Sequence, residues 1–107
     1  MELAMAWDIK VLRTPAEQSL GVKQFQFPLP TNFLLFFPGI APESYIHMIG
    51  VKEPLHIYLL GADFKVVGSG ILHLGEVAPV PQGAEYLIET SWQAAVLTDF
   101  GFLAQYL

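Results

Sequence analysis

The chain has 107 residues, which is the usual size of one domain and enough to bury a core without metals or disulfides. It contains no cysteine, so a disulfide framework, a thiol nucleophile and a cysteine-based zinc site are excluded. Apolar residues make up 53% of the chain and charged residues only 14%, against about a quarter in an average domain, and the net charge is -5. We therefore expect other molecules to cover part of the apolar surface.

The basic residues stand singly along the chain, whereas a nucleic-acid surface needs them clustered. They are Lys10, Arg13, Lys23, Lys52 and Lys65. Apolar runs such as Phe33 to Phe37 are far shorter than the roughly 20 residues of a membrane helix. The N-terminal MELAMAWDIK also lacks the basic flank and apolar stretch of a secretory signal. The sequence thus predicts no nucleic-acid partner, no membrane insertion, and a cytoplasmic or virion-associated protein.

The N-terminal part predicts a strand, a short helix and a second strand. Trp7 to Leu12 is a β-prone run. The sequence TPAE at positions 14 to 17 has a threonine N-cap, a first-turn proline and a glutamate at the third helical position, which predicts a helix that ends before Gly21. The prolines at 28 and 30 interrupt regular structure, and the apolar run Asn32 to Phe37 is typical of a buried strand.

The rest of the chain alternates β-prone runs with turn residues. The predicted strands are Tyr45 to Ile49, Leu55 to Leu60, Lys65 to Leu74, Ala84 to Thr90 and Gly101 to Tyr106, with a loop at residues 79–83. Ser91 to Leu97 is expected to make one or two helical turns. Short strands at close intervals favour an all-β (mainly β) domain over residues 1–107, a small jelly-roll-like sandwich or barrel with one short N-terminal helix.

Four stretches, in order, resemble the domain of unknown function 192 family of bacteria and archaea over about residues 16–89. They are AEQSLGV, NFLLFFP, IHMIGVKEPLHIYLLGADFKVVG and VPQGAEYLIE. The resemblance implies a small β-sandwich of jelly-roll type with a short helix. This chain has His56 where such proteins usually carry aspartate, Gln93 where a glycine is expected, and Leu103-Ala104 in place of a Gly-Asp turn. A polar site built on those family positions is therefore expected to be absent here.

The histidines are the first candidates for chemistry. His47, His56 and His73 fit no compact metal motif by spacing, so we predict no metal, no cofactor, and partly buried, hydrogen-bonded histidines inside apolar strands. Strand alternation places His56 and Tyr58 on one face of their strand and the neighbouring Leu and Ile residues on the other.

Two further patterns have a structural and a catalytic interpretation. Gly68-Ser69-Gly70 lies within a β run and predicts a bulge or tight bend rather than a nucleophile turn. Glu85 and Glu89 fall on the same face of their predicted strand. They form either a carboxylate pair for acid-base chemistry or part of a solvated face, with Tyr86 and Ile88 turned inward. No catalytic residue can be named, and we do not expect an enzyme.

The leading hypothesis is a non-catalytic structural or interaction module that self-associates, as a dimer or trimer, or docks on a larger assembly. Covering a few hundred Å² of apolar surface is worth several kcal/mol at about 25 cal/mol per Å². One alternative is a viral capsid decoration or cement protein. Another is a small-ligand or carbohydrate-binding β domain, with a pocket near the candidate residues His47, His56, Tyr58 and Trp92 or beside the loop at residues 79–83.

Overall fold

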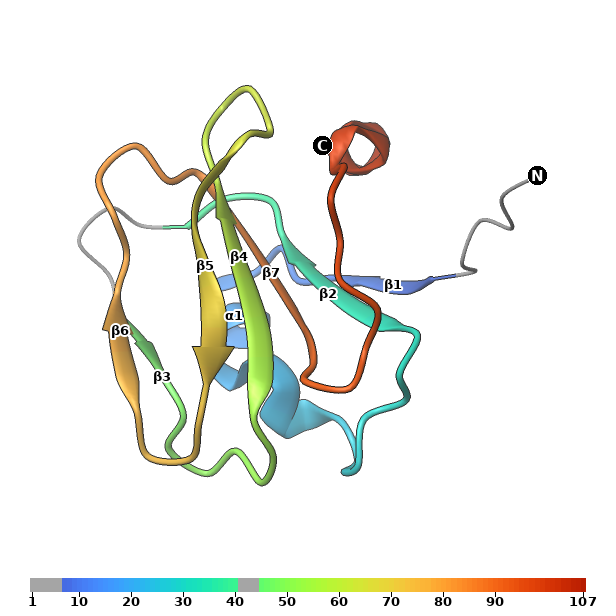
Figure 1. The fold of residues 1–107 in the computed structure, drawn as a ribbon, viewed down its shortest axis with the longest axis vertical. Coiled ribbons are helices and arrows are strands. Elements are labelled where there is room, and N and C mark those ends of the chain that lie inside the picture. The colour runs from blue at the N-terminus through green and yellow to red at the C-terminus, as the bar shows by residue number, and fades with distance from the viewer. Residues whose placement is uncertain (1–6, 41–44) are drawn as a thin grey trace.

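The computed structural model describes residues 7–40 and 45–107, and these form seven strands in two sheets (Figure 1). The larger sheet has the order β1 (Asp8–Val11), β2 (Phe33–Phe37), β7 (Tyr86–Ser91), β4 (Leu55–Leu60) and β5 (Val66–Leu72). The smaller sheet pairs β3 (Tyr45–His47) with β6 (Val77–Pro79). β1 and β2 run parallel, and every other pair is antiparallel. The prediction of a mainly β fold is confirmed; neither of these sheets closes into a barrel.

Helix α1 (Pro15–Leu20) is held by the predicted capping box. The Glu17 N–H donates to Thr14 Oγ1 at 3.1 Å, and Glu17 Oε1 accepts from the Thr14 N–H at 2.9 Å. Gly21 ends the helix with a φ of +51, a conformation that glycine adopts at little cost. The chain continues directly into a 3-10 helix, η1 (Gly21–Gln24), which the sequence did not predict.

The large sheet is covered on both faces, so the side chains of its central strands are buried whichever face they lie on. One face packs under α1, η1 and the β3–β6 pair. Its buried members are Leu12, Val22, Leu29, Leu35, Phe37, Ile46, Met48, Leu55, Ile57, Leu59, Leu72, Ala84 and Leu87. The other face packs under the C-terminal segment, with Leu34, Phe36, Tyr58, Leu60, Ile88, Phe100 and Leu103 buried. Figure 1 shows α1 behind the sheet and the C-terminal segment in front of it. This double burial explains the unbroken apolar run of β2.

One predicted element is wrong. Residues 101–106 form a 3-10 helix, η2 (Gly101–Tyr106), instead of a strand, and Leu103 is fully buried from it. Here the need to cover the second face of the sheet outweighs weak local preferences. Residues 91–97, expected to make one or two helical turns, make a single turn that is closed by the Ala94 N–H and the Ser91 carbonyl at 3.0 Å and does not extend into a helix.

The Gly68-Ser69-Gly70 stretch lies within β5, as predicted, beside a bulge. Leu59 pairs with Gly68 and Leu60 with Val66, so Val67 is the extra residue. β6 was missed because Pro79 marked its segment as a loop; a proline is tolerated at the end of a short edge strand. Within residues 7–40 and 45–107, the helices lack the length and apolar character needed to cross a bilayer.

Candidate functional site

The candidate site is built around a buried carboxyl, that of Glu89. Since β7 is a central strand, its side chains alternate between two covered faces: Tyr86 and Ile88 pack with the second cluster, whereas Leu87 packs with the first. Glu89 shares the face of Leu87 and is only 6% exposed. The prediction of a solvated face is therefore wrong for Glu89, although Tyr86 and Ile88 do turn inward as expected. Glu85 is exposed, precedes β7 and does not line the site.

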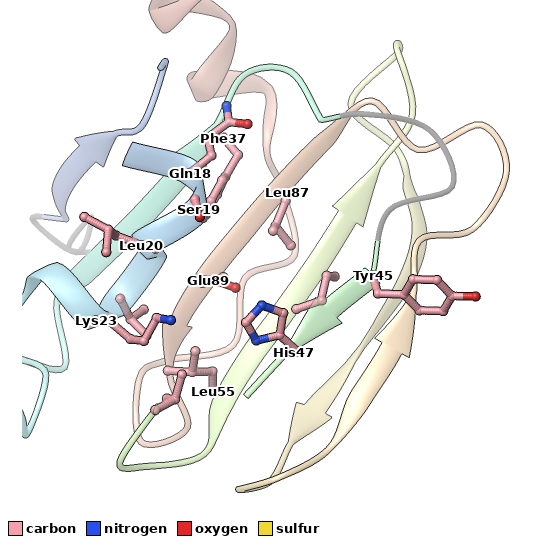
Figure 2. Close-up of a pocket in the computed structure, with 14 residues that line it drawn as sticks. Gln18, Ser19, Leu20, Lys23, Phe37, Tyr45, His47, Leu55, Leu87 and Glu89 are labelled. Carbon is pink, nitrogen blue, oxygen red and sulfur yellow. The ribbon is translucent and has the colours of Figure 1, made fainter. Parts of the chain in front are cut away.

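Glu89 lies at a cavity of about 100 Å³ between the large sheet, the end of α1 and β3 (Figure 2). The walls are Gln18, Ser19, Leu20, Gly21, Val22, Lys23, Phe37, Tyr45, Ile46, His47, Val51, Leu55, Leu87 and Glu89. A second hollow of about 320 Å³ shares Gln18, Phe37, His47 and Leu87 with the cavity. The cavity therefore has room for several heavy atoms and continues into a wider hollow.

The Glu89 carboxyl has no partner among the residues that the structure describes. In the part of the chain that the structure describes, it makes no hydrogen bond and no ion pair. Burial raises the pKa of Glu89 to about 7, because the charged form loses its hydration without compensation. Near neutral pH this side chain is thus divided between its neutral and charged forms, and either form can bind a polar group that enters the cavity.

Two basic side chains stand at the rim of the cavity. Figure 2 shows the Lys23 amine and the His47 ring on opposite sides of the Glu89 carboxyl. Both side chains are exposed. Gly50 has a φ of +78, and a Cβ there would lie 3.1 Å from Lys23 Cδ, so the turn at Gly50 leaves room for the lysine stem. A Cβ on Gly21 would lie 3.7 Å from Glu89 Oε1, so glycine also keeps the space beside the carboxyl open.

His56 and Tyr58 lie together on the opposite face of the sheet, as their alternation predicted. Their rings stack with centroids 4.2 Å apart, and the Tyr58 hydroxyl lies 3.1 Å from His56 Nδ1. The same hydroxyl accepts a hydrogen bond from the Leu97 N–H at 3.1 Å, which leaves its proton for His56 Nδ1. Burial lowers the pKa of His56 and raises that of Tyr58. This pair ties the C-terminal segment to the sheet and does not face the cavity.

The remaining predicted site residues are dispersed. His73 is exposed in the turn after β5, and Trp92 is 49% exposed just after β7. The expectation of partly buried histidines inside strands is therefore confirmed for His56 and wrong for His73. For His47 the strand is correct, because this residue lies in β3, but the burial is wrong, because its side chain is exposed. Among the described residues, no three side chains of metal-binding type come together.

Sequence reasoning named His47 but missed Lys23 and the burial of Glu89. The signal was present in the stretch Leu-Ile-Glu-Thr-Ser, because an acid in a strand that pairs with apolar strands on both sides is buried whichever face it takes. That inference requires knowing the strand order, which a single sequence does not provide.

Fold and site together define a mainly β domain with a small cavity at a buried acid that no described residue pairs with. Its fold is similar to the crystal structure of a protein of unknown function from Novosphingobium aromaticivorans DSM 12444, with a TM-score of 0.65 and 20% sequence identity. The superposition covers 92% of this chain and 67% of that chain. At this identity the likeness supports the fold alone. No family model and no curated protein matches the chain.

Proposed function

We propose that this chain binds a small organic ligand in the Glu89 cavity. The observation that carries the proposal is a carboxyl that is more than nine-tenths buried, has no partner within residues 7–40 and 45–107, and faces an open volume. Keeping it there costs the folded state about 3 kcal/mol at neutral pH, compared with a carboxyl of ordinary pKa. A cost of that size is typical of groups retained for binding or chemistry rather than for stability.

Binding is favoured over catalysis by what surrounds the carboxyl. Among the described residues, Ser19 is the serine of the cavity wall. Neither Glu89 nor His47 makes a hydrogen bond with its hydroxyl. A nucleophile activated by a neighbouring base is thus not assembled. The walls combine apolar side chains with polar groups that can fix the orientation of a small molecule, as ligand pockets do.

A fragment screen followed by amide chemical shifts tests this proposal. We expect weak binders that shift the amides of Gly21, His47 and Leu87 in the unmodified protein and not in Glu89→Leu. The matched control is Glu85→Leu, which alters an exposed acid outside the cavity and should leave the shifts intact. A screen in which every binder shifts other residues, or in which Glu89→Leu binds equally well, would refute the proposal.

Self-association is the second candidate function, and one observation favours it. β5 is an edge strand: among the described residues it pairs with β4 only, and it carries no charge from Val66 to Leu72. Its residues Val66, Val67 and Ile71 are among the exposed large apolar side chains. An uncharged edge without an interior proline is a ready template for pairing with another strand. We propose that two copies pair through β5.

The oligomeric state, measured by sedimentation at micromolar concentration, shows whether β5 pairs with a second copy. Val67→Lys places a charge on the edge and is expected to convert a dimer to a monomer. Val96→Lys is the control, because Val96 is 69% exposed and lies outside the strands. An unmodified protein that stays monomeric, or a dimer that Val67→Lys leaves unchanged, would rule out this interface.

We also propose that the chain is a divergent relative of the domain of unknown function 192 family, with a sandwich of the jelly-roll type. The support is the order of its elements: a helix ended by Gly21, the phenylalanine-rich β2, and the Leu-Ile-Glu segment of β7. A profile built from close homologues of this chain should align family members over about residues 16–89. Alignment to an unrelated family over the same residues would contradict the proposal.

A further inference from the structure

The polar groups of the Glu89 cavity are arranged by depth. The acid is at the wall of the large sheet and nearly inaccessible, whereas Lys23 and His47 are exposed at the rim. A ligand that enters therefore meets positive charge first and the carboxyl last. A ligand that carries only one charge would pair either with Glu89 or with the two basic side chains, but not with both.

Part of the cavity wall is apolar. Phe37, Leu55 and Leu87 from the sheet and Val22 from η1 supply this part, and all four are buried. A few methylene groups fit such a wall better than a polar linker, because burying a polar group without a partner costs free energy. The volume of about 100 Å³, continuing into the wider hollow, limits the deep part of the ligand to a few heavy atoms.

The deep end favours a positively charged hydrogen-bond donor. A cation beside the Glu89 carboxylate restores the interactions that burial removed, and in a site shielded from water that attraction is strong. An anion at the same place requires the carboxyl to hold its proton. At the rim, Lys23 and His47 can both donate to a carboxylate.

We infer, on the basis of the proposed binding function, that the ligand is a small amino acid-like zwitterion. Its ammonium group meets the Glu89 carboxylate, and its carboxylate meets Lys23 and His47 at the rim. The buried acid, the apolar part of the wall and the two basic residues at the rim each account for one part of that molecule.

Binding of such a ligand depends on pH with a definite sign. As pH rises from about 6 to about 8, the ionised fraction of Glu89 rises about tenfold, while an aliphatic ammonium group stays protonated. The other titratable groups at the cavity are Lys23 from η1 and His47 and Tyr45 from β3. α1 contributes only uncharged side chains, and β2 and β4 only apolar ones. The series is repeated in His47→Gln, so that the contribution of Glu89 is measured without the histidine at the rim.

Calorimetry with three matched probes tests the inference: γ-aminobutyrate, propylamine and butyrate. We expect γ-aminobutyrate to bind tightest, with an affinity that rises about tenfold between about pH 6 and pH 8 and with release of protons. Glu89→Gln should lose that pH dependence and at least about tenfold in affinity. Lys23→Met should bring the affinity for γ-aminobutyrate down toward that of propylamine, because only His47 then remains for the carboxylate, and Lys52→Met, at an exposed lysine outside the cavity, should change nothing.

The outcomes separate this inference from the proposed function. One outcome is that butyrate binds tightest, that its affinity rises as pH falls, and that Glu89→Gln abolishes its binding. This outcome would overturn the inference of a zwitterionic ligand but would still support a ligand-binding cavity at Glu89. If none of the three probes binds but other fragments bind at Glu89, the zwitterion inference is likewise wrong and the proposed binding function stands. If neither the probes nor any fragment bind there, both the inference and the proposed function fall.

Discussion

Glu89 makes the stability of the protein depend on pH. Burial raises the pKa of Glu89 from 4.5 to about 7, so between those values the folded state keeps a proton that the unfolded state has lost. The free energy of unfolding therefore falls as pH rises through this window, by about 3 kcal/mol in all. Denaturant titrations of the unmodified protein and Glu89→Gln at about pH 5 and pH 8 measure the difference. Glu85→Gln, at an exposed acid, is the control.

A Glu89→Gln variant that loses as much stability over this pH range as the unmodified protein would show that other groups cause the dependence. Glutamine keeps the size of the side chain and removes its titration. The comparison between pH values within each variant is therefore more informative than the comparison between variants at one pH.

Gly50 and Gly75 provide a matched pair for testing how Lys23 is placed. Both have positive φ, +78 and +81, so alanine at either position costs about 1 kcal/mol of backbone strain. Only at Gly50 would the new Cβ meet a neighbour, Lys23 Cδ at 3.1 Å. We expect similar losses of thermal stability in Gly50→Ala and Gly75→Ala but weaker ligand binding in Gly50→Ala alone. Equal binding in the two variants would show that the stem of Lys23 shifts without consequence.

Among the elements, the C-terminal segment depends on one hydroxyl of β4. Tyr58→Phe removes the acceptor of the Leu97 N–H and the partner of His56 Nδ1, leaving polar groups without partners. We expect a loss of about 1–3 kcal/mol in the free energy of unfolding. Hydrogen exchange should be faster in residues 97–106 and unchanged at Leu87. Tyr45→Phe, at a tyrosine that is 68% exposed, should be neutral, and equal effects from both variants would refute this role.

Local signals predicted the elements whose cause is local. The capping box of α1, the apolar run of β2 and the alternation around His56 are all short-range patterns, and the structure has each of them. η2 and β6 could not be found in this way. Their conformations are set by which face of the sheet remains to be covered, and that depends on contacts between residues distant in the sequence.

The candidate site was only partly predictable for the same reason. His47 was named as a candidate because histidines are few, while Lys23 and Glu89 looked like ordinary surface charges. Glu89 became part of a cavity because β7 lies between β2 and β4 in the sheet, far from its order in the chain. A carboxyl in a strand thus changes from solvated to buried through topology alone.

At the scale of the whole molecule, the large sheet separates two cores of unequal cover. The first face has α1, η1 and the β3–β6 pair, whereas the second depends on the segment after β7, which buries Phe100 and Leu103 against Leu34 and Ile88. Each of those two covering side chains is worth about 1.5–3 kcal/mol of burial. Their joint loss would remove a large share of the 5–15 kcal/mol, roughly, that stabilises a domain.

Deleting residues 98–107 is therefore expected to expose the second face of the large sheet. Dye binding, self-association and loss of cooperative unfolding would be the measurable signs.

Leu103→Ala is a milder change to the same face. It should lower the free energy of unfolding by about 2–5 kcal/mol, since Leu103 is fully buried. Leu107→Ala, at a leucine that is 59% exposed, should stay within about 0.5 kcal/mol. Because the Glu89 cavity lies on the other face, Leu103→Ala should keep its ligand affinity, and a parallel loss of binding would mean that the two faces are not independent.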